Sequence, residues 1–275
     1  MAERQTRVVL LTGCELRHDF IRISLALNPR IQVQRTFCEK KTTLRSLNTG
    51  DRIALAHAKE REQSEDDFFH AFVELAPDHS NPVSIPGGGI NDAEYRDEIL
   101  SLNPDILVCY GTSIIREPLL SDFEGRFLNI HLGLSPYYRG AGTNFWPIVR
   151  NEPEFVGVTF MQIDAGVDSG PIIHQMRATM FPNDSIHSIG NRLIRDIALE
   201  LPVIVDRFPL FRRIPQDTID IKGNNEKVFR SRDFSGASVV EAREEISRGT
   251  VRRYLENKDE RDRNAPIVEQ WEILK

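Results

Sequence analysis

The chain has 275 residues, a hydrophobic content of 40% and a formal net charge of −6 at pH 7. This composition suffices for the core of one large domain, alone or with a small addition, and the acidic balance argues against a chain built to hold nucleic acid through its phosphates. No apolar stretch approaches the ~18 residues that a transmembrane helix needs, so we expect no membrane segment and a cytoplasmic location.

The sequence has three widely spaced cysteines, Cys14, Cys38 and Cys109, and no C-x-x-C motif. An odd count in a long chain argues against a disulfide framework and favours a reducing compartment. The N-terminal apolar run is also too short for a secretory signal. Because free cysteine usually packs as a small hydrophobe, we expect all three thiols to be buried and structural.

The first half of the chain alternates apolar runs with helical patterns. Short apolar runs predict strands at Val8–Thr12, Ile31–Cys38, Asp105–Tyr110 and Phe127–His131. Apolar residues at helical spacing predict a helix at Leu16–Leu27, one or two at Asp51–Ala76, and one from about Asn91 to Leu102. The Pro/Gly stretch Pro82–Gly89 is interpreted as a loop. Strands that alternate with helices indicate an α/β fold with a mostly parallel sheet.

The pattern changes in the second half of the chain. Two longer apolar runs, Phe155–Ile163 and Pro171–Met180, follow one another with no helix between them and are joined by the turn-rich segment DAGVDSG. A helix is predicted over Ser185–Phe208, with Asp184 or Ser185 as its N-cap.

Beyond Phe208 the chain becomes charge-rich, with nearly equal numbers of acidic and basic residues. A helical pattern recurs at Ser238–Ile246. We therefore predict a main domain over residues 1–208 and a small C-terminal extension over residues 209–275.

A candidate site lies in NIHLGLSPYYRG, residues 129–140. Side chains alternate along a strand, so Asn129 and His131 would point the same way at its carboxyl end, where parallel sheets place functional groups. The loop Gly166–Gly170 carries Asp168 between glycines, which let ligand and backbone approach closely. An amide, an imidazole and a carboxylate suit acyl transfer to an amine, because the amine needs a base and the carbonyl oxygen needs donors.

Other interpretations of these residues stay open at this point. Each residue alone has a structural explanation, because Asn and Asp form turns and histidine is often a hydrogen-bonded structural residue. Ser135 with His131 and Asp168 suggests a hydrolase triad, but the chain has no G-x-S-x-G elbow. A zinc site at His131 and Asp168 lacks the paired ligand spacing of known zinc motifs, so we expect no metal there.

NIHLGLSPYYRG followed by VGVTFMQIDAGVDSGPIIHQ resembles the signature of the formyltransferases that use 10-formyltetrahydrofolate. The resemblance begins near Asn103, extends to about Phe208, and rests on three separated motifs in the same order. It implies a Rossmann-like catalytic domain over residues 1–208 that takes a formyl group from 10-formyltetrahydrofolate.

The resemblance also assigns roles by position. Asn129, His131 and Asp168 match the catalytic residues of the family. Ile114 and Ile115 match the loop that packs on the folate pterin. The remaining folate-binding residues that the resemblance implies are Leu120, Ala165, Gly166 and Val167.

The chain departs from the family pattern in places that concern the acceptor. Leu132-Gly133 replaces the Pro-Ser that follows the histidine, and Ser135 replaces a leucine. The segment Gly13–His18 lacks the glycine-rich phosphate loop of the glycinamide ribonucleotide enzymes. Residues 209–275 are shorter and less basic than the C-terminal domain of methionyl-tRNA formyltransferases. Formyltetrahydrofolate hydrolases carry an N-terminal regulatory module for which the chain has no room before Val8.

The remaining resemblance is to the amino-sugar N-formyltransferases, which implies a small-molecule amine acceptor, on a nucleotide-linked sugar, and makes a nucleic acid unlikely as partner. The candidate acceptor contacts are Tyr137, Tyr138, Arg139, Asn144, Phe145 and Trp146. For Phe145 and Trp146 the alternative is the core face of a helix. Formyl hydrolysis, formylation of methionyl-tRNA and non-catalytic folate binding stay open as functions, and a homodimer stays open as the assembly.

Overall fold

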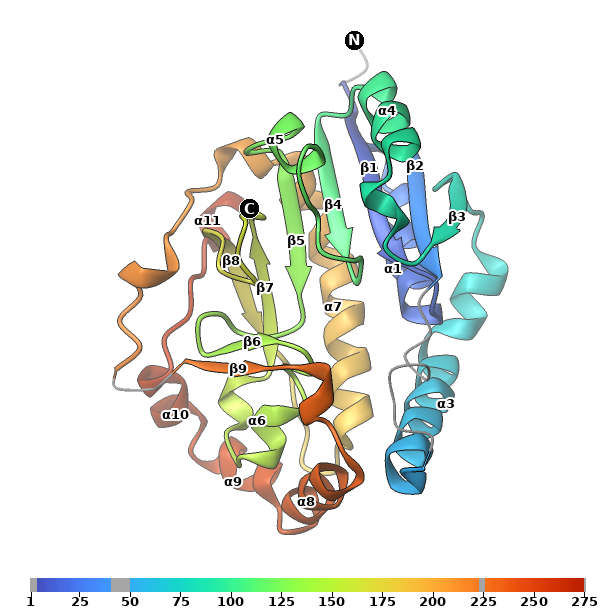
Figure 1. Cartoon of the computed structure of the whole chain (residues 1–275). Helices are drawn as coiled ribbons and strands as arrows, with labels where there is room; N and C mark the ends of the chain where they lie inside the picture. Colours follow the sequence, from blue (N-terminus) through green and yellow to red (C-terminus); the bar gives the residue numbers. More distant parts are fainter. Residues whose placement is uncertain (1–3, 41–49, 223–225, 275) are drawn as a thin grey trace.

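The protein is described by a computed structural model over residues 4–40, 50–222 and 226–274. Its centre is a seven-stranded sheet of order β3-β2-β1-β4-β5-β7-β8 (Figure 1). The strands are β1 (Thr6–Gly13), β2 (Ile31–Lys40), β3 (Pro82–Pro86), β4 (Ile106–Tyr110), β5 (Phe127–His131), β7 (Gly157–Met161) and β8 (Ile172–Arg177). The neighbours from β3 to β5 pair in parallel, whereas β7 is antiparallel to both β5 and β8. The predicted α/β fold with a mostly parallel sheet is confirmed.

The interpretation of Pro82–Gly89 as a loop is wrong in its first five residues. There β3 pairs in parallel with the last part of β2 and forms the edge of the sheet. Proline is tolerated on an edge strand because its missing N–H faces away from the ladder. Of the five residues of β3, only Ile85 is buried, so the segment lacks the apolar alternation that would have marked it as a strand.

Helices cover both faces of the sheet. The longer ones are α1 (Leu16–Ala26), α3 (Arg52–Leu75), α4 (Ala93–Leu102) and α7 (Ile186–Asp206), and the short ones are α5 (Leu119–Asp122), α6 (Trp146–Val149), η1 (Gly89–Asn91) and η2 (Pro153–Phe155). α1, α3 and α7 contact one another and share a core with alternate residues of β1. The intervening residues of β1 join a second core under α4 and α5.

α7 begins where the sequence predicts it. The Ser185 hydroxyl accepts a hydrogen bond from the Ser188 N–H, which satisfies one free donor of the first turn. Leu193, Ile197 and Leu201 follow at helical spacing and are at most 1% exposed. Burying each such side chain stabilises the fold by roughly 1.5–3 kcal/mol.

The segment after α7 packs against the same core. Its elements are η3 (Phe208–Leu210), η4 (Gln216–Thr218), β9 (Lys227–Phe229), η5 (Ser231–Asp233), α8 (Gly236–Ser247), α9 (Thr250–Glu256), α10 (Lys258–Asn264) and α11 (Trp271–Leu274). β9 pairs with β6 (Tyr138–Gly140), directly after β5 in the chain (Figure 1). α8 contains the predicted helix Ser238–Ile246 and contacts α3 and α6. A division into domains at residue 208 stays a prediction.

The three cysteines differ in their surroundings. Cys38 and Cys109 are buried, as expected for structural thiols, but Cys14 is exposed in the turn after β1, so that part of the prediction is wrong. Burial raises the pKa of the Cys38 thiol to about 11. Among the residues that the structure describes, no helix is long and apolar enough to cross a membrane.

Candidate active site

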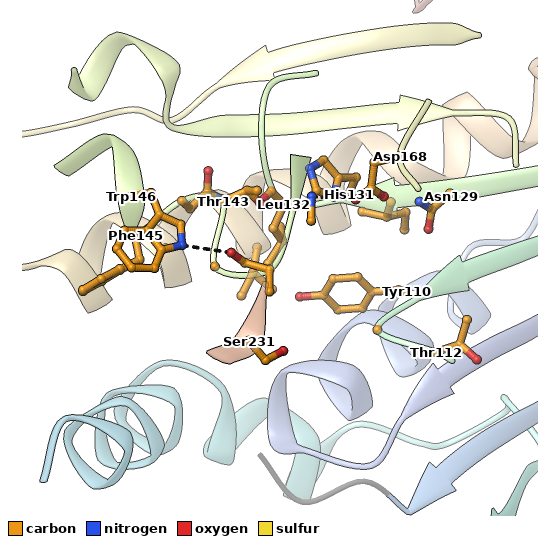
Figure 2. Close-up of a pocket in the computed structure, with 18 of the residues that line it drawn as sticks. Tyr110, Thr112, Asn129, His131, Leu132, Thr143, Phe145, Trp146, Asp168 and Ser231 are labelled. Carbon is orange, nitrogen blue, oxygen red and sulfur yellow. Dashed lines mark hydrogen bonds and ion pairs between the residues drawn. The ribbon is translucent and has the colours of Figure 1, made fainter. Parts of the chain in front are cut away.

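A cavity of about 920 Å³ lies beside the carboxyl ends of β4 and β5. Figure 2 shows Asn129, His131 and Asp168 together at one side of it, with Phe145 and Trp146 farther along. The walls come from α3, α7, the loops that follow β4, β5 and β7, and the segment around η5. Segments far apart in the sequence therefore enclose one space, which is large enough for two small molecules.

β5 supplies two of the predicted catalytic side chains. Asn129 and His131 both line the cavity, as the alternation of a strand requires, and His131 is only 7% exposed. The His131 Nδ1 lies 3.3 Å from Asp168 Oδ1. Its Nε2 lies 3.2 Å from the Tyr138 carbonyl oxygen. Both ring nitrogens therefore face oxygen atoms, and a ring with an N–H on each nitrogen would donate to both.

Asp168 is held from three directions. Its backbone is in the left-handed region, with φ of +50°. Its Oδ2 accepts a hydrogen bond of 3.0 Å from the Gly140 N–H, while its Oδ1 faces His131. Gln216, from the segment after α7, donates through Nε2 to the carbonyl oxygens of Asp168 at 2.8 Å and Gly170 at 2.9 Å. The predicted three residues therefore meet, and Gln216 fixes the loop that makes this possible.

Replacing Gln216 with methionine should leave both of these carbonyl oxygens without their donor. We expect a loss of about 1–3 kcal/mol in the free energy of unfolding. We also expect a roughly tenfold loss of turnover, because small displacements of a catalytic group are costly. Steady-state kinetics and urea unfolding measure the two effects. The control is Gln63→Met on α3, where the exposed Gln63 amide donates to Asp67. Equal turnover and equal free energies of unfolding in the two variants would show that Gln216 does not hold the loop that carries Asp168.

The loops after β4 and β7 form one apolar wall of the cavity. Ile114, Ile115, Gly166 and Val167 line it, and these are residues that the resemblance assigns to folate. Two of the assigned residues lie elsewhere. Leu120 packs against the core under α4 and α5, and Ala165 is exposed and does not line the cavity.

Three of the residues assigned to the acceptor do not line the cavity. The rings of Tyr137 and Tyr138 are fully buried in the core. The Tyr137 hydroxyl donates to the Pro266 carbonyl oxygen at 2.6 Å, and the Tyr138 hydroxyl donates to the Glu152 carboxylate.

Arg139 lies outside the cavity as well, in an ion pair of 2.6 Å with Glu226. The pairing of β6 with β9 explains the placements of Tyr138 and Arg139, while Tyr137 lies directly before β6 and is held by its bond to Pro266. The sequence analysis interpreted the residues after His131 as a loop, and nothing in that segment predicts the pairing of β6 with β9.

The other assigned acceptor residues, Asn144, Phe145 and Trp146, do line the cavity. Trp146 also stacks on Phe229 of β9, with ring centroids 4.5 Å apart and an interplanar angle of 9°. The Asn144 Oδ1 accepts a hydrogen bond from the Gly157 N–H at 2.9 Å. Phe145 and Trp146 thus pack in the core and also line the cavity.

The cavity is also lined by charged residues that sequence reasoning missed. Arg17, Arg61 and Glu65 line it. Arg17 Nη1 lies 2.7 Å from Glu65 Oε1, and Arg61 Nε lies 3.4 Å from the same oxygen. From the sequence, the charged residues of α3 are expected to lie on a solvent-exposed face of the helix. In the structure Glu65 instead faces inward and is 3% exposed.

Ser135 does not support a hydrolase triad. Its side chain is fully buried and it does not line the cavity. Its N–H donates to Thr159 Oγ1 at 3.0 Å, and its carbonyl oxygen accepts from Gln175 at 2.7 Å. These bonds assign Ser135 to the support of the loop that follows His131.

The sequence is similar to those of known formyltransferases. The family model described as "Formyl transferase" matches residues 39–201. The methionyl-tRNA formyltransferase of Trichlorobacter lovleyi is 33% identical over 144 residues, which are 52% of this chain and 45% of that protein. The chain thus spans less than half the length of that curated relative.

Solved structures share the fold at low identity. Phosphoribosylglycinamide formyltransferase from Anaplasma phagocytophilum has a TM-score of 0.53 and 15% identity, over 82% of this chain and 99% of that one. A sugar N-formyltransferase from a Shewanella species has a TM-score of 0.52 and 17% identity, over 83% and 78%. Because the family model matches more than half of the residues, the chain belongs to the formyl transferase family.

Proposed function

We propose that this protein transfers a formyl group from 10-formyltetrahydrofolate to a primary amine of a nucleotide-linked amino sugar. The observation that carries the proposal is the pair of His131 and Asp168, 3.3 Å apart, beside Asn129 in one cavity. These are the groups that acyl transfer to an amine requires.

The apolar wall of the cavity fits a folate. Ile115 is 5% exposed, and Ile114 and Val167 present apolar surface that a flat pterin ring would cover. Main-chain groups of the loop around Gly166 supply polar atoms at the same wall, as expected for a site with a few placed hydrogen-bond partners. When bound, 10-formyltetrahydrofolate would supply the formyl carbon and a nitrogen leaving group.

The residues of the chain would divide the work of the transfer. Asn129, through its amide N–H, and His131, through a ring N–H, would donate to the formyl oxygen as it gains negative charge. The His131 Nε2–H would have to be shared with the Tyr138 carbonyl, which lies 3.2 Å away. Asp168 would orient His131, accept the proton that the attacking amine loses, directly or through water, and return a proton to the folate nitrogen as the bond from that nitrogen to the formyl carbon breaks.

The far end of the cavity supports a small acceptor. Arg230, Ser231 and Phe234, from the segment after α7, line it together with Phe145 and Trp146. Aromatic rings beside charged and hydroxyl groups suit a sugar that carries a charged substituent. Methionyl-tRNA is the second candidate acceptor, favoured by the identity to the Trichlorobacter lovleyi protein.

Mass spectrometry of amines incubated with the protein and 10-formyltetrahydrofolate tests the proposal. The panel contains nucleotide-linked amino sugars, free amino sugars and methionyl-tRNA. We expect the mass of a formyl group to appear on a nucleotide-linked sugar. Formylation of methionyl-tRNA alone would overturn the acceptor class, and release of formate with no formylated amine would identify a hydrolase instead.

A further inference from the structure

A cluster of two imidazoles and one carboxylate lies away from the catalytic residues. His57 and Glu60 are three residues apart on α3, which places them on the same side of the helix. His187 is in the first turn of α7, a helix that packs against α3. One donor atom from each of the three residues lies within 4.8 Å of the other two.

His57 is a buried imidazole that has no polar partner within the part of the chain that the structure describes. It is 8% exposed, and its ring contacts are with Phe145, Phe234 and His187. The His57 and His187 rings are 4.5 Å apart between centroids, and His187 Nε2 lies 4.0 Å from Glu60 Oε2.

We propose that His57, Glu60 and His187 form a binding site for a divalent transition metal ion of the Zn²⁺ class. Two imidazole nitrogens and one carboxylate oxygen are a common three-residue ligand set for Zn²⁺. Imidazole favours such ions over Mg²⁺ and Ca²⁺, which prefer oxygen ligands alone. Because His57 and His187 both line the cavity, the remaining coordination position would open into it.

Arginine side chains surround this cluster and bear on the strength of binding. Arg243 of α8 donates through Nη2 to both carboxylate oxygens of Glu60, at 2.7 Å each. A ligating carboxylate is commonly hydrogen-bonded in this way, so the contact orients Glu60 and leaves lone pairs for a metal. Arg61 and Arg243 are also positive charges near the site, and the affinity should therefore be lower than in a site without them.

Titration with Co²⁺ alone tests the site without reference to any formyl transfer. The untagged full chain is first dialysed against a chelator, and visible absorption then reports the coordination of Co²⁺ by protein ligands. We expect saturation at one equivalent and displacement of the Co²⁺ by Zn²⁺. His57→Phe, His187→Phe and Glu60→Gln should each weaken binding at least tenfold, because loss of even an indirect metal contact costs 10- to 100-fold.

His70→Phe is the matched control, because His70 is on the same helix but exposed, in a pair of 3.4 Å with Asp66. It should bind Co²⁺ like the unmodified protein. The Glu60 side chain is 52% exposed, so Glu60→Gln should fold even if a buried histidine variant does not. The absence of saturable binding to the unmodified protein, or equal binding by Glu60→Gln and His70→Phe, would overturn the proposal.

Discussion

Replacing His131 or Asp168 with alanine should lower the turnover of formyl transfer by at least about a hundredfold to a thousandfold. Removal of one donor to a developing oxyanion typically has this effect. Loss of Asp168 should be as damaging, because His131 loses its partner at 3.3 Å and the attacking amine loses its base. Folate affinity should change little, since the apolar wall stays intact. Steady-state kinetics and a folate-binding titration measure the two quantities.

α3 offers a matched control for this experiment. His70 Nδ1 and Asp66 Oδ1 are 3.4 Å apart, nearly the same separation as in the catalytic pair, but both side chains are more than half exposed. His70→Ala and Asp66→Ala should therefore leave turnover unchanged. Near-normal turnover in His131→Ala or Asp168→Ala would contradict the assignment of the catalytic residues.

Replacing Gly140 with alanine should strongly destabilise the protein. Gly140 has φ of +91°, and a Cβ built there would lie 2.1 Å from the Phe229 carbonyl oxygen. The left-handed conformation alone costs an alanine about 1–2 kcal/mol. The clash would also part β6 from β9 and move the N–H that donates to Asp168. We expect a total loss of about 3 kcal/mol or more, together with a large loss of turnover.

Gly249→Ala separates the cost of the left-handed backbone from the cost of the clash with the Phe229 carbonyl oxygen. Gly249 also has a positive φ of +78°, but no heavy atom lies within 4 Å of a Cβ built there. It should therefore show only the conformational cost of about 1–2 kcal/mol and keep its activity. Urea unfolding of both variants gives the comparison. Equal losses would mean that the Phe229 contact is not rigid and that β9 does not fix this part of the site.

The central strands and the common direction of Asn129 and His131 could be predicted from local patterns, whereas the place of Asp168 beside them was predicted from the family resemblance. The buried run of β4 is continuous, and the common direction of Asn129 and His131 follows from the alternation of side chains along β5. β3 was missed because an edge strand with a proline at each end has no such pattern.

The contacts of Gln216 and the pairing of β6 with β9 join distant segments and could not be predicted from the sequence. Gln216 lies 48 residues after the loop that it holds, and nothing in its local surroundings marks it as part of a site. The placements of Tyr138 and Arg139 follow from the pairing of β6 with β9, two strands of three residues each. Such short strands leave no periodicity to detect.

The most direct test of the central claim is mass spectrometry of the amine product, with His131→Ala beside the unmodified protein. Both are incubated with 10-formyltetrahydrofolate and the nucleotide-linked amino sugar that the panel identifies, or the whole panel if none stands out. The account predicts a formylated amine with the unmodified protein and about a hundredfold less, or lower still, with His131→Ala. Equal amounts of formylated amine from both, or none from the unmodified protein while it binds folate, would contradict it.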